Sequence, residues 1–134
     1  MAGDFGYGAV LGWKEFQFDD GGTSDKLLVV LGAKTGKNYL AVLTTSQPHG
    51  RKASPGCHAE DGYFFIGAGK HGFPKDTWLE LHRPKEMDAA TVVKGNFSGD
   101  IWVVANLPLQ IVNEIRNCLK QSPDITQHQL TLLE

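Results

Sequence analysis

Cysteine is scarce in this chain of 134 residues, and its two cysteines, Cys57 and Cys118, lie far apart in the sequence. Small domains that are held together by a disulfide framework contain cysteine at a much higher density. We therefore expect no disulfide framework, and we expect a reducing environment such as the cytoplasm.

Long apolar runs are also missing. The N-terminus, Met1-Ala2-Gly3-Asp4, has neither the basic start nor the apolar core of a signal peptide. No apolar run approaches the ~18 residues that a membrane-spanning helix requires. The sequence thus predicts a soluble cytoplasmic protein with no membrane partner.

An excess of positive charge is absent as well, because 13 lysines and arginines face 15 aspartates and glutamates, for a net charge of −2. Such a chain has no overall positive field that would attract nucleic acid. Any contact with RNA or DNA would have to come from a local basic patch.

Signatures of metal and nucleotide sites are lacking. Cys57 and His58, together with His49 and His71, offer enough ligands for zinc, but their spacing differs from that of structural zinc sites. A nucleophile made from Cys57 and a histidine has no local signature either. The segment 67–69 does not complete a phosphate-binding fingerprint. We expect no metal and no cofactor.

Glycine and proline, by contrast, are plentiful, with 16 and 6 residues. They predict many turns between short strands. No repeat, low-complexity tract or linker divides the chain, so we expect a single domain over residues 1–134. The expected strands are Val10–Phe18, Lys26–Leu31, Tyr39–Thr45, Tyr63–Ile66, Thr77–Leu81, Ala90–Val93 and Ile101–Ala105.

One helix is expected near the C-terminus. Apolar residues at helical spacing begin after Pro108, and Ser122-Pro123 marks the end of the segment. Its apolar stripe is formed by Leu109, Val112, Ile115 and Leu119. The prediction is a mainly β protein: a small, strongly curved β-barrel with one C-terminal helix.

The most informative segment joins a basic residue to an apolar strand. Lys26 opens the run Leu27–Leu31, and the next apolar run, Leu40–Leu43, ends in the hydroxyls of Thr44-Thr45-Ser46. If these two strands pair, the cation and the hydroxyls could meet at one edge of the barrel. Such a combination can hold a phosphodiester.

In this order of parts the chain resembles the PemK/MazF toxins of type II toxin–antitoxin systems. That family has a Gly/Ser-rich loop, a basic residue that opens an apolar strand (here Lys26–Leu31), a strand ending in hydroxyls (here Thr44–Ser46) and a C-terminal helix. The resemblance implies an SH3-like barrel, a homodimer, an antitoxin protein as partner, and metal-independent cleavage of single-stranded RNA by its own 2′-hydroxyl.

The resemblance also assigns roles to single residues. Lys26 would stabilise the charge that develops on the phosphate, and Thr45 with Ser46 would donate hydrogen bonds to phosphate or leaving oxygens. Without the resemblance, Lys26 is equally well interpreted as a solvated lysine at a strand end. Thr45 and Ser46 would then only form a turn.

Two basic loops are candidates for holding the RNA. One is the long irregular segment 46–62 with His49, Arg51 and Lys52, and the other contains Lys70 and His71. A loop of the first kind can follow an RNA backbone, and the imidazole of His49 or His58 could carry a proton. The alternative for each residue is a polar loop with nothing bound.

A second function remains open. The family usually carries Arg-Pro where this chain has Lys26-Leu27, and lysine lacks the bidentate fork of arginine. Together with the negative net charge, this departure favours a non-catalytic SH3-like barrel that docks a protein partner.

Overall fold

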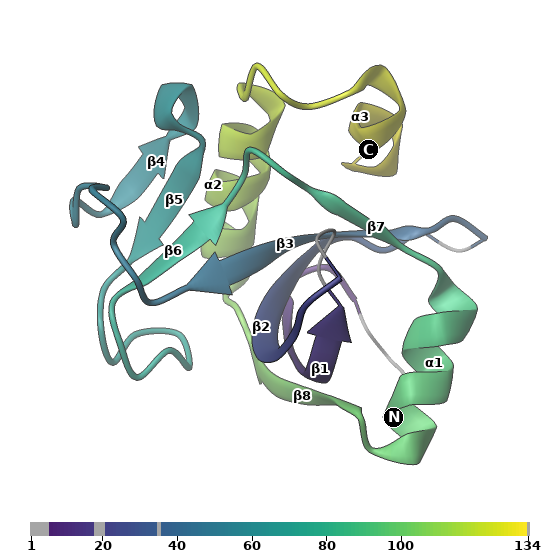
Figure 1. Ribbon diagram of the computed structural model, residues 1–134. Coiled ribbons are helices and arrows are strands. Elements are labelled where there is room, and N and C mark those ends of the chain that lie inside the picture. The colour runs from purple at the N-terminus through teal and green to yellow at the C-terminus, as the bar shows by residue number, and fades with distance from the viewer. Residues whose placement is uncertain (1–5, 18–20, 35, 134) are drawn as a thin grey trace.

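The computed structural model describes residues 6–17, 21–34 and 36–133, and their fold is mainly β with antiparallel strand pairing (Figure 1). The strands run along the sheet in the order β4-β5-β6-β3-β2-β1-β8, and β7 pairs with β3 beside this path. Their bounds are β1 Ala9–Gln17, β2 Thr23–Gly32, β3 Tyr39–Thr45, β4 Gly56–His58, β5 Tyr63–Ile66, β6 Thr77–Glu80, β7 Lys85–Met87 and β8 Ile101–Asn106.

The centre of the sheet is buried on both faces. Along β2, Val29 and Leu31 belong to one apolar cluster, whereas Leu28 and Val30 belong to another. Successive side chains of a strand point to opposite faces, so a continuous apolar run marks a strand that is covered on both sides. The strand expected at Lys26–Leu31 is confirmed, as part of β2.

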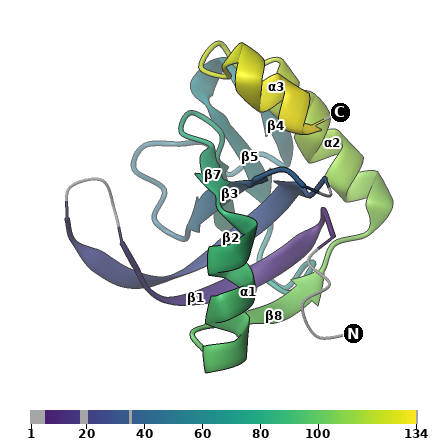
Figure 2. The same ribbon diagram turned by 90° about the vertical axis from the view of Figure 1, so that its right-hand side faces the viewer.

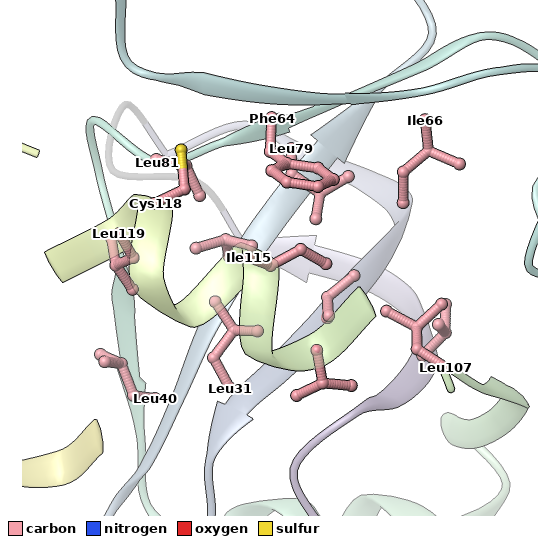
Figure 3. Close-up of a cluster of buried hydrophobic side chains, with 14 of the residues drawn as sticks. Leu31, Leu40, Phe64, Ile66, Leu79, Leu81, Leu107, Ile115, Cys118 and Leu119 are labelled. Atoms are coloured by element: carbon pink, nitrogen blue, oxygen red, sulfur yellow. The ribbon is translucent and has the colours of Figure 1, made fainter. Parts of the chain in front are cut away.

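Helix α2, Leu109–Lys120, packs on one of these faces. Val112, Ile115 and Leu119 are almost fully buried, and Figure 3 shows Ile115 among side chains of the sheet. The predicted helix is therefore confirmed, but Leu109 of the expected stripe is 60% exposed. A short helix, α3 (Gln127–Leu133), follows and adds Leu132 and Leu133 to the same cluster.

The strand expected at Ala90–Val93 is wrong, because this segment lies in helix α1, Ala89–Ser98. The side chain of Asp88 accepts a hydrogen bond from the backbone N–H of Ala90 at 3.3 Å, and Gly99 ends the helix in the left-handed conformation. Val92 packs into the second cluster, on the face opposite α2. Figure 2 shows α1 crossing the sheet, away from α2 and α3. The described residues thus hold three α-helices instead of one.

The low density of cysteine predicted no disulfide framework, but the structure contains one disulfide. Cys57 of β4 and Cys118 of α2 form a disulfide with a Cα–Cα distance of 5.6 Å across a sequence separation of 61. Folding brings them together because β4 pairs with β5 at the edge of the sheet that α2 covers. Within the described residues, no helix is long and apolar enough to span a lipid bilayer.

Candidate functional site

The end of β3 and the beginning of β2 form the candidate site. The two strands are antiparallel, with Leu28 opposite Leu43, so the next residues bring Lys26 beside the hydroxyls that end β3. Lys26 Nζ donates to the carbonyl oxygen of Thr44 at 3.5 Å. Lys26 therefore lies at the end of β3, and it lines one pocket together with Thr45 and Ser46.

The two threonines at this edge have different surroundings. Thr44 is buried, and its hydroxyl donates to the carbonyl oxygen of Leu27 at 2.8 Å. Thr45 is half-buried and its hydroxyl accepts from the backbone N–H of Gln47 at 3.1 Å, while Ser46 is exposed. Thr44 thus holds the strands together, and Thr45 and Ser46 present their hydroxyls at the site.

These groups line a pocket of about 340 Å³. We name it the phosphate pocket after the ligand that we propose for it below. Its far wall comes from the loop 67–76 through Phe73, Pro74 and Lys75. Phe73 is 1% exposed and anchors this wall in the core. Lys75 is exposed, so a second ammonium group lies at the same pocket.

Asp25 also lines the phosphate pocket, and the sequence analysis missed it. Its Oδ1 accepts from the backbone N–H of Glu15 at 2.9 Å. Glu15 lies in an irregularity of β1 with a φ of 54°, which turns its N–H toward the side chain of Asp25. The expected strand began at Lys26, whereas β2 begins at Thr23 and includes Asp25.

The charges at the phosphate pocket favour an anion. Lys26 and Lys75 outnumber Asp25 among its lining residues, although the whole chain carries a net charge of −2. An excess of one sign of charge in a concave site produces a local potential even when the net charge of the whole chain has the other sign. The pocket therefore carries a local excess of positive charge on a chain whose net charge is negative.

The predicted RNA-binding residues His49, Arg51 and Lys52 lie outside the phosphate pocket lining. Arg51 is half-buried and forms an ion pair with Glu80 at 3.3 Å. The backbone of Lys52 is fixed at both ends, because its N–H donates to the Tyr63 hydroxyl and its carbonyl accepts from Trp78 Nε1, each at 3.0 Å. His49 and the side chain of Lys52 are exposed.

The histidine at position 58, a candidate proton carrier, is stacked on Tyr63 with a ring distance of 4.5 Å. Its Nε2 lies 2.7 Å from the carbonyl oxygen of Ser54. Neither contact brings it to the phosphate pocket. Lys70 and His71 line a second pocket, to which the loop 67–76 also contributes.

A metal centre finds no support in the described part of the chain, where no three His, Cys, Asp or Glu side chains are grouped to hold an ion. Cys57 is bonded to Cys118 in the disulfide. A zinc site or a cysteine nucleophile would need a free thiol at Cys57.

Comparison with protein-family models and with curated proteins found no match to this chain. The chemistry of the site has to be argued from its geometry. Two ammonium groups, two hydroxyls and a carboxylate line one pocket. Such groups can bind a phosphodiester and can transfer protons to or from the oxygens that react at its phosphorus.

Proposed function

We propose that this protein is a metal-independent endoribonuclease of the PemK/MazF type that cleaves single-stranded RNA at the phosphate pocket. The observation that carries the proposal is that Lys26, Thr45 and Ser46 line one pocket with Lys75 and Asp25. Separate stretches of the chain supply these groups, and together they match what a phosphoryl transfer requires.

In the proposed reaction the RNA's 2′-oxygen attacks the adjacent phosphorus while the bond from phosphorus to the 5′-oxygen breaks. The carboxylate of Asp25 accepts the proton of the 2′-hydroxyl, because the hydrogen bond from Glu15 holds only one of its oxygens. Lys26, Thr45 and Ser46 stabilise the negative charge of the phosphorane. Lys75 supplies a proton to the leaving 5′-oxygen, and the products are a 2′,3′-cyclic phosphate and a 5′-hydroxyl.

The test is incubation of the purified protein with mixed-sequence single-stranded RNA in EDTA, followed by mapping of the ends. We expect discrete cuts that leave 2′,3′-cyclic phosphates, and a loss of about 10²- to 10³-fold in rate for Lys26→Ala. Lys37→Ala is the matched control, because Lys37 is an exposed lysine in the turn between β2 and β3. Equal rates for wild type and Lys26→Ala would overturn the site.

The resemblance adds finer expectations to this proposal: the sheet would be a relative of the SH3-like barrel, and the setting would be the cytoplasm. The disulfide between Cys57 and Cys118 argues against a reducing setting, since cytoplasmic proteins usually keep their thiols reduced. Blocking free thiols in intact native cells and then counting the blocked cysteines of the protein would show whether Cys57 and Cys118 are reduced there. This measurement would decide this part of the proposal.

A homodimer and an antitoxin partner also belong to the proposal. Trp102, Val103 and Val104 on the edge strand β8 are each more than 40% exposed, and Phe97 of α1 is 88% exposed. A protein partner that covers these side chains would remove apolar surface from water. We expect light scattering to give a dimer mass for wild type and a monomer mass for Val103→Lys. A dimer mass for both proteins would refute this surface as the dimer interface.

The second candidate is a non-catalytic module that docks a protein. It is favoured by the negative net charge and by a lysine in place of the family's arginine, because lysine binds phosphate only as a point charge. Absence of cleavage, together with RNA binding that does not change with salt, would favour the module.

A further inference from the structure

A second pocket of about 270 Å³ lies between β5, the loop 67–76 and α2. Its walls are mostly apolar: Phe64 and Ile66 come from β5, and Ile111 comes from the first turn of α2. Figure 3 shows Phe64 and Ile66 on the side of the sheet that faces α2. Two opposite charges, Lys70 and Glu114, stand at the same pocket. We call it the base pocket.

We propose that the base pocket binds a guanine base of the RNA strand whose phosphodiester occupies the phosphate pocket. This inference rests on the proposed function and deepens it by naming a base. A mostly apolar pocket suits a nucleobase, since single-stranded RNA is recognised through unstacked bases that are held by apolar contact and by hydrogen bonds to their edges.

The charged pair selects guanine among the four bases. A carboxylate is an acceptor only, and an ammonium is a donor only. The Watson–Crick edge of guanine carries two adjacent N–H donors, which the two oxygens of Glu114 can accept together, and beside them a carbonyl oxygen for Lys70. Adenine, cytosine and uracil each offer one donor position on that edge, so they cannot fill both carboxylate oxygens.

One loop joins the two pockets. Residues 67–76 contribute Lys70 to the base pocket and Lys75 to the phosphate pocket. The loop is held by a hydrogen bond from Gly69 N–H to the carbonyl oxygen of Phe73 at 2.7 Å and by another from Ala68 N–H to Asp76 Oδ1 at 2.9 Å. Five residues span at most about 18 Å, a distance that a short stretch of single-stranded RNA can bridge.

The disulfide clamps two walls of the base pocket. Gly56 lines the pocket next to Cys57, and Glu114 lies about one helical turn before Cys118. The bond therefore fixes the distance between β4 and the face of α2 that carries Glu114. A fixed spacing is what a site needs in order to discriminate bases by hydrogen bonds.

The first test measures binding without cleavage. We expect 5′-GMP to shift the backbone NMR signals of Gly56, Gly67 and Ile111, with an affinity about tenfold higher than that of 5′-AMP, 5′-CMP or 5′-UMP. Glu114→Gln should reduce this preference to less than about threefold, because an amide offers only one acceptor. Glu60→Gln makes the same charge change on the exposed residue Glu60 and should keep the preference.

Equal affinities for the four nucleotides, or signal shifts confined to other residues, would overturn the inference. Tighter binding of free 5′-GMP than of a guanine-containing RNA oligonucleotide would also overturn it, because the site would then serve a free nucleotide.

The second test maps cut sites in RNA and separates the two proposals. Cuts at a fixed spacing from guanine, with about tenfold lower kcat/KM for Glu114→Gln on these sites, would support both. Cuts with no guanine preference would overturn the base pocket and leave the endoribonuclease standing. Guanine-selective binding without any cleavage would support the base pocket and overturn the endoribonuclease.

Discussion

The two pockets share the loop 67–76 but are built in different ways. The phosphate pocket rests on a hydrogen-bonded pair of neighbouring strands, β2 and β3, which are also close in sequence. The base pocket is formed by β4, β5 and α2, and a disulfide joins β4 to α2 across a sequence separation of 61. The first pocket therefore depends on local strand pairing, whereas the second depends on the docking of a distant helix.

The largest expected effect comes from removing the disulfide between Cys57 and Cys118. Replacing both cysteines by serine, Cys57→Ser with Cys118→Ser, should lower the free energy of unfolding by about 4 kcal/mol, the loop-closure value for this separation. Urea denaturation would measure it. The NMR signals around the base pocket should shift, while those of Thr44 and Thr45 should stay in place.

The matched control is a reducing agent. It should destabilise the wild type as the double substitution does, and it should leave the serine variant unchanged. If the signals of both pockets shifted equally on reduction, the two would not be built independently.

A second prediction concerns the phosphate pocket alone. Asp25→Asn removes the proposed proton acceptor but keeps an oxygen for the N–H of Glu15. We expect the cleavage rate to fall by about 10²-fold or more, with an unchanged melting temperature. Single-turnover cleavage assays and thermal denaturation would measure the two quantities. A wild-type rate would remove Asp25 from the mechanism.

The same contrast explains which features could be predicted from the sequence. The strand at Lys26–Leu31, the hydroxyls that end β3 and the helix after Pro108 follow from local patterns, and the structure contains them. The meeting of Lys26 with Thr45 needed only one antiparallel hairpin, and register then follows from the pairing itself.

Features that depend on contacts between distant parts of the chain could not be predicted from the sequence. The pairing of Cys57 with Cys118 follows from where α2 docks, which no spacing reveals. Helix α1 replaced an expected strand because the cap at Asp88 and the contact of Val92 outweigh the β propensity of Thr91, Val92 and Val93. Asp25 was missed because the irregularity at Glu15, which orients it, arises from the pairing of β1 with β2.

A third prediction separates two neighbouring threonines of the phosphate pocket. Thr44→Val removes a buried hydrogen bond to Leu27 and should cost about 1 kcal/mol of stability. Thr45→Val should leave stability nearly unchanged and lower the rate of cleavage by about tenfold. Urea denaturation and cleavage assays on both variants would measure the difference. The reverse pattern would mean that Thr44 is the hydroxyl that acts on the RNA.

The last prediction concerns Arg51 and Lys52, which line neither pocket. Arg51 and Lys52 are adjacent and carry the same charge, but Arg51 pairs with Glu80, whereas the side chain of Lys52 is exposed. Arg51→Ala should lower stability by about 1 kcal/mol, because it leaves Glu80 without its partner. Lys52→Ala should leave stability unchanged and, if the RNA passes over Lys52, reduce the slope of log affinity against log salt by about one. An unchanged slope for Lys52→Ala would confine RNA binding to the two pockets and the loop between them.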